Sequence, residues 1–139
     1  MKKHTIIAVL AAALLAPAVR AADVTEADYE KAMKDVLAGM QGAGKALRDG
    51  GADLTPVVAG GKAIDAALGS VDSFWVARKD AEASKMNAAA RAAAMAVVKA
   101  AESKDAAATG EAMKALQGTC KACHDVHREQ LPDKSYRLK

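Results

Sequence analysis

Apolar residues recur at helical spacing in four stretches of the chain, and short breaks separate these stretches. The first predicted helix begins after Val24, with Thr25 as its N-cap and Asp28 in its first turn, and it runs to about Arg48. Residues that favour turns follow it, namely Gly50, Gly51 and Asp53.

The second predicted helix opens at Thr55-Pro56, where threonine is the expected N-cap and proline takes the first helical position. Gly69-Ser70 closes it. Its apolar stripe consists of Val57, Ile64, Leu68 and Val71.

A third helix is predicted over about 73–101, because alanine, the strongest helix former, dominates this stretch. So many alanines leave the buried face poorly marked. The larger side chains expected to point inward are Trp75, Met86 and Val97.

A fourth helix is predicted after the break at 102–108, with Thr109 as its cap and Leu131-Pro132 as its end. One broad face of this helix carries Met113, Leu116, Cys120, Cys123, His124 and His127. Four amphipathic helices with short connections predict an all-α fold, an antiparallel four-helix bundle. No repeat or low-complexity linker indicates a second domain, so residues 22–139 are expected to form one bundle.

The N-terminal residues read as a secretory signal peptide, residues 1–21. Lys2 and Lys3 precede an apolar run from Thr5 to Ala16, and small residues lead to a cleavage site after Ala21. The run is too short to span a bilayer as a mature helix, so no stable membrane insertion is expected after cleavage. The sequence therefore predicts an exported, periplasmic protein.

The formal net charge of +3 comes from Lys2, Lys3 and Arg20, which all belong to that segment. The remaining chain has 17 basic and 17 acidic side chains. Nucleic acid selects basic surfaces, so this balance argues against a nucleic-acid partner.

The only two cysteines stand in the sequence Cys120-Lys121-Ala122-Cys123-His124, a CxxCH motif. This is the attachment signature of c-type haem: two thiols bond to one porphyrin, and the next residue offers an imidazole to the iron. The motif predicts one haem c, bound through Cys120 and Cys123, with His124 as an axial ligand. Because the chain has only one Phe, one Trp and two Tyr, a buried porphyrin would supply much of the apolar core.

Three other cysteine chemistries fit the motif less well than covalent haem. A redox dithiol favours a CxxC at a helix N-terminus, whereas this pair lies late in a helical stretch. A disulfide at this spacing closes too short a loop to stabilise the fold much. A zinc site from Cys120, Cys123, His124 and His127 has enough ligand atoms but lacks the separated ligand pairs of zinc modules.

The chain resembles the class II cytochromes c, four-helix bundles in which haem attaches close to the C-terminus rather than the N-terminus. The strongest similarity is the ending at 120–128, which is similar to the family's CKACHDxFR or CKACHDxYR. Phe74-Trp75 resembles an aromatic-Trp pair of the family, and residues 31–35 (KAMKD) are similar to a KLMKD segment of its low-spin members.

The resemblance implies that Met33 is the second axial ligand, as the Met of that segment is in low-spin members. Leu37 is then expected to pack on the porphyrin ring, and Met40, on the same helix face, to pack there or compete for the iron. The resemblance also places Trp75 near the porphyrin. Arg128 either binds a haem propionate or is solvated.

Two positions depart from the family pattern. His127 replaces the aromatic residue before the arginine, and it is expected to lie at the haem edge on the proximal side. Glu30-Lys31 stand where cytochromes c′ often have Arg-Gln, which weakens the similarity to cytochromes c′ proper.

The expected function is a single-electron carrier with His/Met-ligated low-spin iron, and no enzyme, because no nucleophile, base or substrate pocket is visible. The alternative is a binder of nitric oxide or carbon monoxide, similar to cytochromes c′, with five-coordinate iron. Redox proteins are the expected partners, since the tail from Arg128 to Lys139 has a local excess of two positive charges. A homodimer is a further possibility, because class II relatives often dimerise through their first two helices and small residues there would allow close approach: Gly39, Gly42, Ala43 and Gly44.

Overall fold

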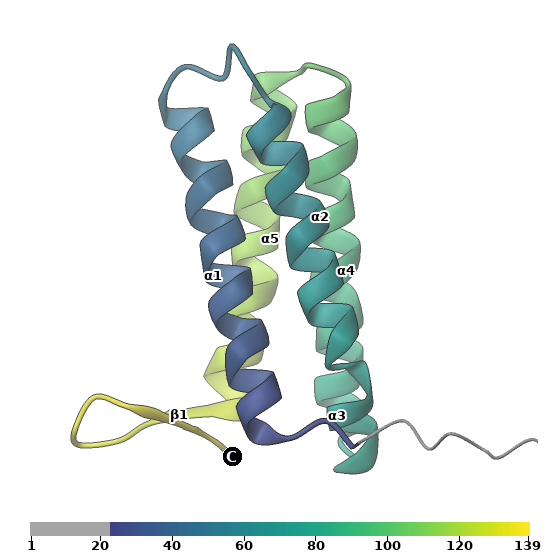
Figure 1. The fold of residues 1–139 in the computed structure, drawn as a ribbon, viewed down its shortest axis with the longest axis vertical. Helices are drawn as coiled ribbons and strands as arrows, with labels where there is room; N and C mark the ends of the chain where they lie inside the picture. The colour runs from purple at the N-terminus through teal and green to yellow at the C-terminus, as the bar shows by residue number, and fades with distance from the viewer. Residues whose placement is uncertain (1–22) are drawn as a thin grey trace, which may run out of the picture.

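The computed structural model describes residues 23–139, which form four long helices, one short helix and a two-stranded hairpin (Figure 1). The long helices are α1 (Glu26–Arg48), α2 (Thr55–Ser70), α4 (Ala81–Glu102) and α5 (Ala106–His127). They run alternately up and down, so the predicted antiparallel four-helix bundle is confirmed. The predicted signal peptide lies outside the described residues.

Helix α1 begins with the capping box that its sequence predicts. The backbone N–H of Asp28 donates to the Thr25 hydroxyl at 3.2 Å, and the N–H of Thr25 donates to the Asp28 carboxylate at 2.9 Å. Two backbone donors at the helix start are thereby satisfied.

The continuous third helix predicted over 73–101 is wrong. A short helix, α3 (Asp72–Ala77), is followed by a turn in which Lys79 has a φ of 58°. Asp80 then caps α4 by accepting a hydrogen bond from the N–H of Ala83 at 2.9 Å. Alanine content predicted helix throughout, but the side chain of Asp80 starts a new helix here.

Two predicted caps are also wrong. Leu54 is the N-cap of α2 and makes no side-chain bond, while the N–H of Thr55 donates to Asp53 at 2.9 Å. Asp105 caps α5. Thr109 is buried one turn inside α5, where its hydroxyl donates to the carbonyl oxygen of Asp105 at 2.6 Å.

Helix α5 ends at His127 rather than at Leu131-Pro132, and the residues after it form a hairpin. Strands β1 (Arg128–Gln130) and β2 (Tyr136–Leu138) pair antiparallel, with Glu129 opposite Arg137. The side chains of that pair form an ion pair at 2.8 Å. Leu138 then packs against the core, so the hairpin is fixed to the base of the bundle.

The core consists of two clusters. The larger one lies between the four long helices and contains Val36, Val57, Ile64, Leu68, Val97, Met113 and Leu116 among others. The smaller one lies at the α3 end of the bundle and contains Tyr29, Ala32, Val71, Phe74, Trp75 and Ala83. Trp75 and Val97 are buried as predicted, whereas Met86 is only partly buried.

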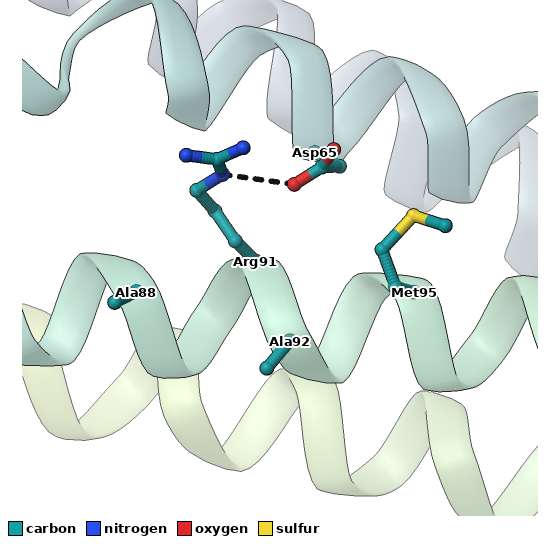
Figure 2. A pocket seen from close by; sticks show the side chains of 5 residues that line it. All are labelled: Asp65, Ala88, Arg91, Ala92 and Met95. Carbon is teal, nitrogen blue, oxygen red and sulfur yellow. Dashed lines mark hydrogen bonds and ion pairs between the residues drawn. The ribbon is translucent and has the colours of Figure 1, made fainter.

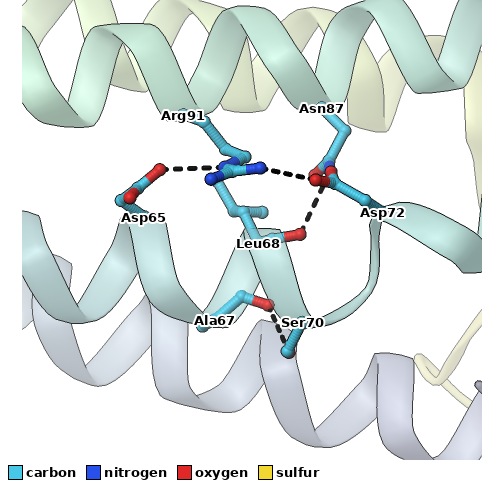
Figure 3. A network of polar contacts seen from close by, with 7 residues as sticks. All are labelled: Asp65, Ala67, Leu68, Ser70, Asp72, Asn87 and Arg91. Atoms are coloured by element: carbon cyan, nitrogen blue, oxygen red, sulfur yellow. Dashed lines mark hydrogen bonds and ion pairs between the residues drawn. The ribbon is translucent and has the colours of Figure 1, made fainter. Parts of the chain in front are cut away.

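A polar network joins α2, α3 and α4 on the outside of the bundle (Figure 3). The guanidinium of Arg91 donates to Asp65 at 2.8 Å and to Asp72 at 2.5 Å. The amide of Asn87 donates to Asp72 and to the carbonyl oxygen of Leu68. The network therefore orients α3 against α4 across the turn at Lys79.

The small residues of α1 serve mainly its packing on α2. Gly39 and Ala43 face α2 within the same chain, where an added Cβ on Gly60 would meet both. A Cβ on Gly42 would meet nothing within 4 Å, and Gly42 is exposed. Of the four residues considered for a homodimer, Gly42 is thus the most accessible to a second copy.

Candidate functional site

The last two turns of α5 bring Cys120, Cys123 and His124 to one side of the helix. Residues three and four apart lie on one helix face, so the motif presents both thiols and the imidazole together. All three side chains are partly buried, and both cysteines are free thiols. The site is accessible to a large group and is not closed by a disulfide.

Both thiols are held in the protonated state by their surroundings. Burial raises the pKa of Cys120. Burial also raises the pKa of Cys123, and the charges of Cys120 and Asp80 add to the effect. A redox dithiol needs the opposite shift, a lowered thiol pKa at a helix N-terminus. The environment of this CxxC therefore does not suit dithiol exchange.

The imidazole of His124 is prepared to act as a neutral ligand. Burial lowers its pKa, the positive charge of Arg128 lowers it further, and Asp125 opposes the shift. Asp125 is itself paired with Lys121 at 2.5 Å. A metal-binding histidine must be neutral, and this environment favours that form.

Helix α1 contributes an apolar surface with three long side chains. Met33 and Met40 are partly buried against the large cluster, and Leu37 between them is 56% exposed. Each helix packs closely on α2 or α4, whereas α1 and α5 touch each other only sparsely. The side of the bundle between α1 and α5 is thus loosely packed and exposes apolar surface at Leu37, as a flat apolar group such as porphyrin requires.

Tyr29 links α1 to the cysteines, and the sequence analysis did not single it out. Burial raises the pKa of its phenol to about 12, and the charge of Cys123 adds to the shift. Since α1 and α5 run in opposite directions, the start of α1 and the end of α5 lie at the same end of the bundle (Figure 1). Met33, in the first half of α1, and the CxxCH motif, in the second half of α5, are therefore at the same end of the bundle.

Among the described residues, His127 does not join Cys120, Cys123 and His124 in one set of metal ligands. It is buried, its Nδ1 lies 3.4 Å from the Asp80 carboxylate, and its ring lies 5.5 Å from that of Trp75. The four residues considered for zinc do not converge, and no three His, Cys, Asp or Glu side chains within residues 23–139 are grouped for a metal ion. Asp80 was not predicted from the sequence, although aspartate before an alanine-rich run is a typical N-cap.

Arg128 is the C-cap residue of α5 and begins the hairpin. Its guanidinium lies 3.9 Å above the ring of Tyr136, a cation–π contact. The sequence analysis expected Arg128 to bind a haem propionate or to be solvated, and neither role includes this contact. The tail had no apolar pattern, so a hairpin could not be foreseen.

An open hollow lies elsewhere, on the face formed by α2 and α4 (Figure 2). It is lined by Asp65, Ala88, Arg91, Ala92 and Met95. Arg91 is already bound by Asp65 and Asp72, and alanines make up much of the remaining lining. This hollow lies on different helices from the CxxCH motif and offers no comparable chemistry.

Residues 61–128 match the family model described as Cytochrome C'. The match includes α3, α4 and α5 and ends at the first residue of the hairpin. Comparison with curated proteins and with solved structures gave no significant match.

Proposed function

Because the chain belongs to the cytochrome c′ family, a family of haem proteins that are not enzymes, we propose that it carries single electrons on one haem c. The observation that supports this function best is the position of the CxxCH motif. It lies partly buried on α5, beside the sparsely packed apolar side of α1.

The residues present fit a covalently bound haem. Cys120 and Cys123 provide the thioether bonds, and His124 provides a neutral imidazole as the proximal ligand. When bound, the haem supplies a reversible one-electron couple of ferric and ferrous iron. The apolar side chains of α1 would exclude water from the porphyrin.

Met33 is the proposed distal ligand. It lies in the half of α1 that is at the same end of the bundle as the motif, and it packs against both core clusters. A thioether ligand raises the reduction potential, and a filled sixth position means that few bonds change when the electron moves. Leu37 and Met40, one and two turns further along α1, provide further apolar contact.

The alternative is a five-coordinate iron that binds nitric oxide or carbon monoxide. One observation favours it: Met33 already has apolar neighbours in both clusters and could serve as a packing residue alone. In that arrangement its sulfur would stand near the iron without a bond.

The periplasm is the proposed location, because c-type haem is attached outside the cytoplasm and the N-terminus has the pattern of a signal peptide. Among the described residues, no helix is both long enough and apolar enough to cross a membrane. The proposed partners are redox proteins with an acidic surface. In the hairpin region Arg137 pairs with Glu129, while Lys134 and Lys139 form no ion pair with the residues that the structure describes and could attract such partners.

The absorption spectrum of the purified ferrous protein with and without carbon monoxide tests the proposal. Electron transfer through Met33-ligated iron predicts a low-spin spectrum that carbon monoxide leaves unchanged. A high-spin spectrum that shifts with the gas would contradict it and favour the gas binder. A colourless protein that contains zinc would contradict both.

A further inference from the structure

The chain that follows α5 leaves this helix and then returns to it. Strand β1 begins at Arg128, directly after α5, and β2 ends at Leu138. The N–H of Lys139 then donates to the carbonyl oxygen of His127 at 3.0 Å. The hairpin is therefore closed on the helix that carries the haem motif, at the end of the bundle where α1 begins (Figure 1).

Contacts across the hairpin hold its shape. The guanidinium of Arg128 lies 3.9 Å above the ring of Tyr136, and the amide of Gln130 donates to the Tyr136 hydroxyl at 3.1 Å. At the turn, the N–H of Leu131 donates to the carbonyl oxygen of Ser135 at 2.8 Å. A two-stranded hairpin is only marginally stable alone in water, so its contact with the bundle must complete it.

Leu138 provides this contact with the bundle. It is the one residue of β2 that is not exposed, and its side chain packs against the smaller core cluster. Helix α1 contributes Tyr29 and Ala32 to this cluster, and Met33 of the same helix packs against it. Through Leu138 the hairpin thus joins the end of α5 to a cluster built on the first half of α1.

The helices themselves hold this side of the bundle weakly. Helix α1 packs chiefly on α2 and α5 packs chiefly on α4, while α1 and α5 touch each other only sparsely. The ion pair between Arg78 and Glu26, at 2.6 Å, fastens the start of α1 to the end of α3 and not to α5. A haem attached to α5 would therefore depend on a further element to keep α1 close to it.

We propose that residues 128–139 form a strap that holds the first half of α1, and with it Met33, against the haem attached to α5, with Leu138 as the anchor of the strap. The proposal rests on the haem of the proposed function, but it does not require a bond between Met33 and the iron. Leu138 is a positioning residue, because it acts on the iron only through the position of α1. If Met33 ligates the iron, the strap keeps that bond from opening; if the sixth position is empty, the strap keeps Met33 in the path of an entering gas.

Hydrogen exchange of the holoprotein tests the strap itself. L138A removes the anchor, and L138M keeps an apolar side chain of similar size. V126A is the matched control, since Val126 lies in the last turn of α5, is 42% exposed and belongs to neither core cluster. We expect exchange at residues 29–36 to accelerate about tenfold in L138A, and to stay near the wild-type rate in L138M and V126A. Acceleration in α3 as large as that in α1 would show that Leu138 only fills the cluster, and would overturn the proposal.

The rate of carbon monoxide binding to the ferrous protein tests the effect on the iron. L138A should bind the gas about tenfold faster than wild type, while L138M and V126A should match wild type. An equal rate in L138A and V126A would mean that the hairpin does not position Met33, which would refute the proposal. The wild-type spectrum decides ligation by Met33, whereas the ratio of L138A to wild type decides the strap, so failure of one is distinct from failure of the other.

Discussion

A Cβ atom placed on Gly60 of α2 would lie 2.8 Å from the carbonyl oxygen of Gly39 on α1. Real Cβ atoms do not approach a backbone oxygen so closely, so G60A must push the two helices apart. Alanine normally stabilises a helix interior by roughly 0.5–1 kcal/mol relative to glycine. Here we expect a net loss of about 1–3 kcal/mol, as for other overpacked cores, measured by urea unfolding of the holoprotein.

G42A is the matched control for this prediction, because Gly42 is also a helical glycine, on α1, and a Cβ there meets nothing within 4 Å. This variant should gain about 0.5–1 kcal/mol. If both variants were stabilised alike, the close contact of α1 and α2 would not limit the residue at position 60.

Met33 can be tested by truncation of its side chain. In M33A the iron would lose its sixth ligand, so ferrous protein should become high-spin and bind carbon monoxide, and the midpoint potential should fall. M40A is the control, since Met40 lies on the same face of α1 and should leave the spectrum unchanged. Carbon monoxide binding that is identical in wild type and M33A would rule out ligation by Met33.

Asp28 should make the start of α1 sensitive to acid. Its hydrogen bonds with Thr25 lower its pKa below the ordinary value of 3.8. Because the folded pKa is the lower one, the carboxylate stabilises the fold above the unfolded pKa, and this contribution is lost as the pH falls through the folded value. Wild type should therefore unfold at higher urea than D28N at pH 7, and the difference should disappear at the acid end of the titration. A difference that stays constant with pH would argue against an ionised cap.

Lys79 is strained by its left-handed backbone, with a φ of 58°. Glycine adopts this conformation without steric cost, so K79G should stabilise the protein by about 1 kcal/mol. K85G, at an exposed position inside α4, should instead cost about 1 kcal/mol. Thermal unfolding of the two variants would distinguish relief of strain from a general effect of glycine.

The bundle and the haem motif could be predicted because each depends on local pattern. The stripe from Val57 to Leu68 and the spacing of Cys120 and Cys123 need no knowledge of distant residues. The break between α3 and α4 could not be read from composition, since neither glycine nor proline marks it and the single side chain of Asp80 decides where α4 begins.

The contacts of His127 also depend on tertiary structure. Spacing on α5 placed it one turn from His124, but its partner Asp80 and its neighbour Trp75 come from a turn and a helix some fifty residues earlier. Likewise, the hairpin is held by the contact of the Arg128 guanidinium with the Tyr136 ring and by the packing of Leu138 against the core. No periodicity in residues 128–139 predicts these contacts.

The haem-free chain should be much less stable than the holoprotein. Alanines fill many core positions, α1 and α5 touch sparsely, and Leu37 is 56% exposed, so the porphyrin must supply the missing apolar contact along α1. A C120A/C123A variant, which cannot attach haem, should melt at a lower temperature, and hydrogen exchange should accelerate more in α1 than in α4. The unaltered chain made without haem is the control for the two substitutions and should behave in the same way. A cooperative transition at the holoprotein's temperature would mean that the protein side chains alone complete the core.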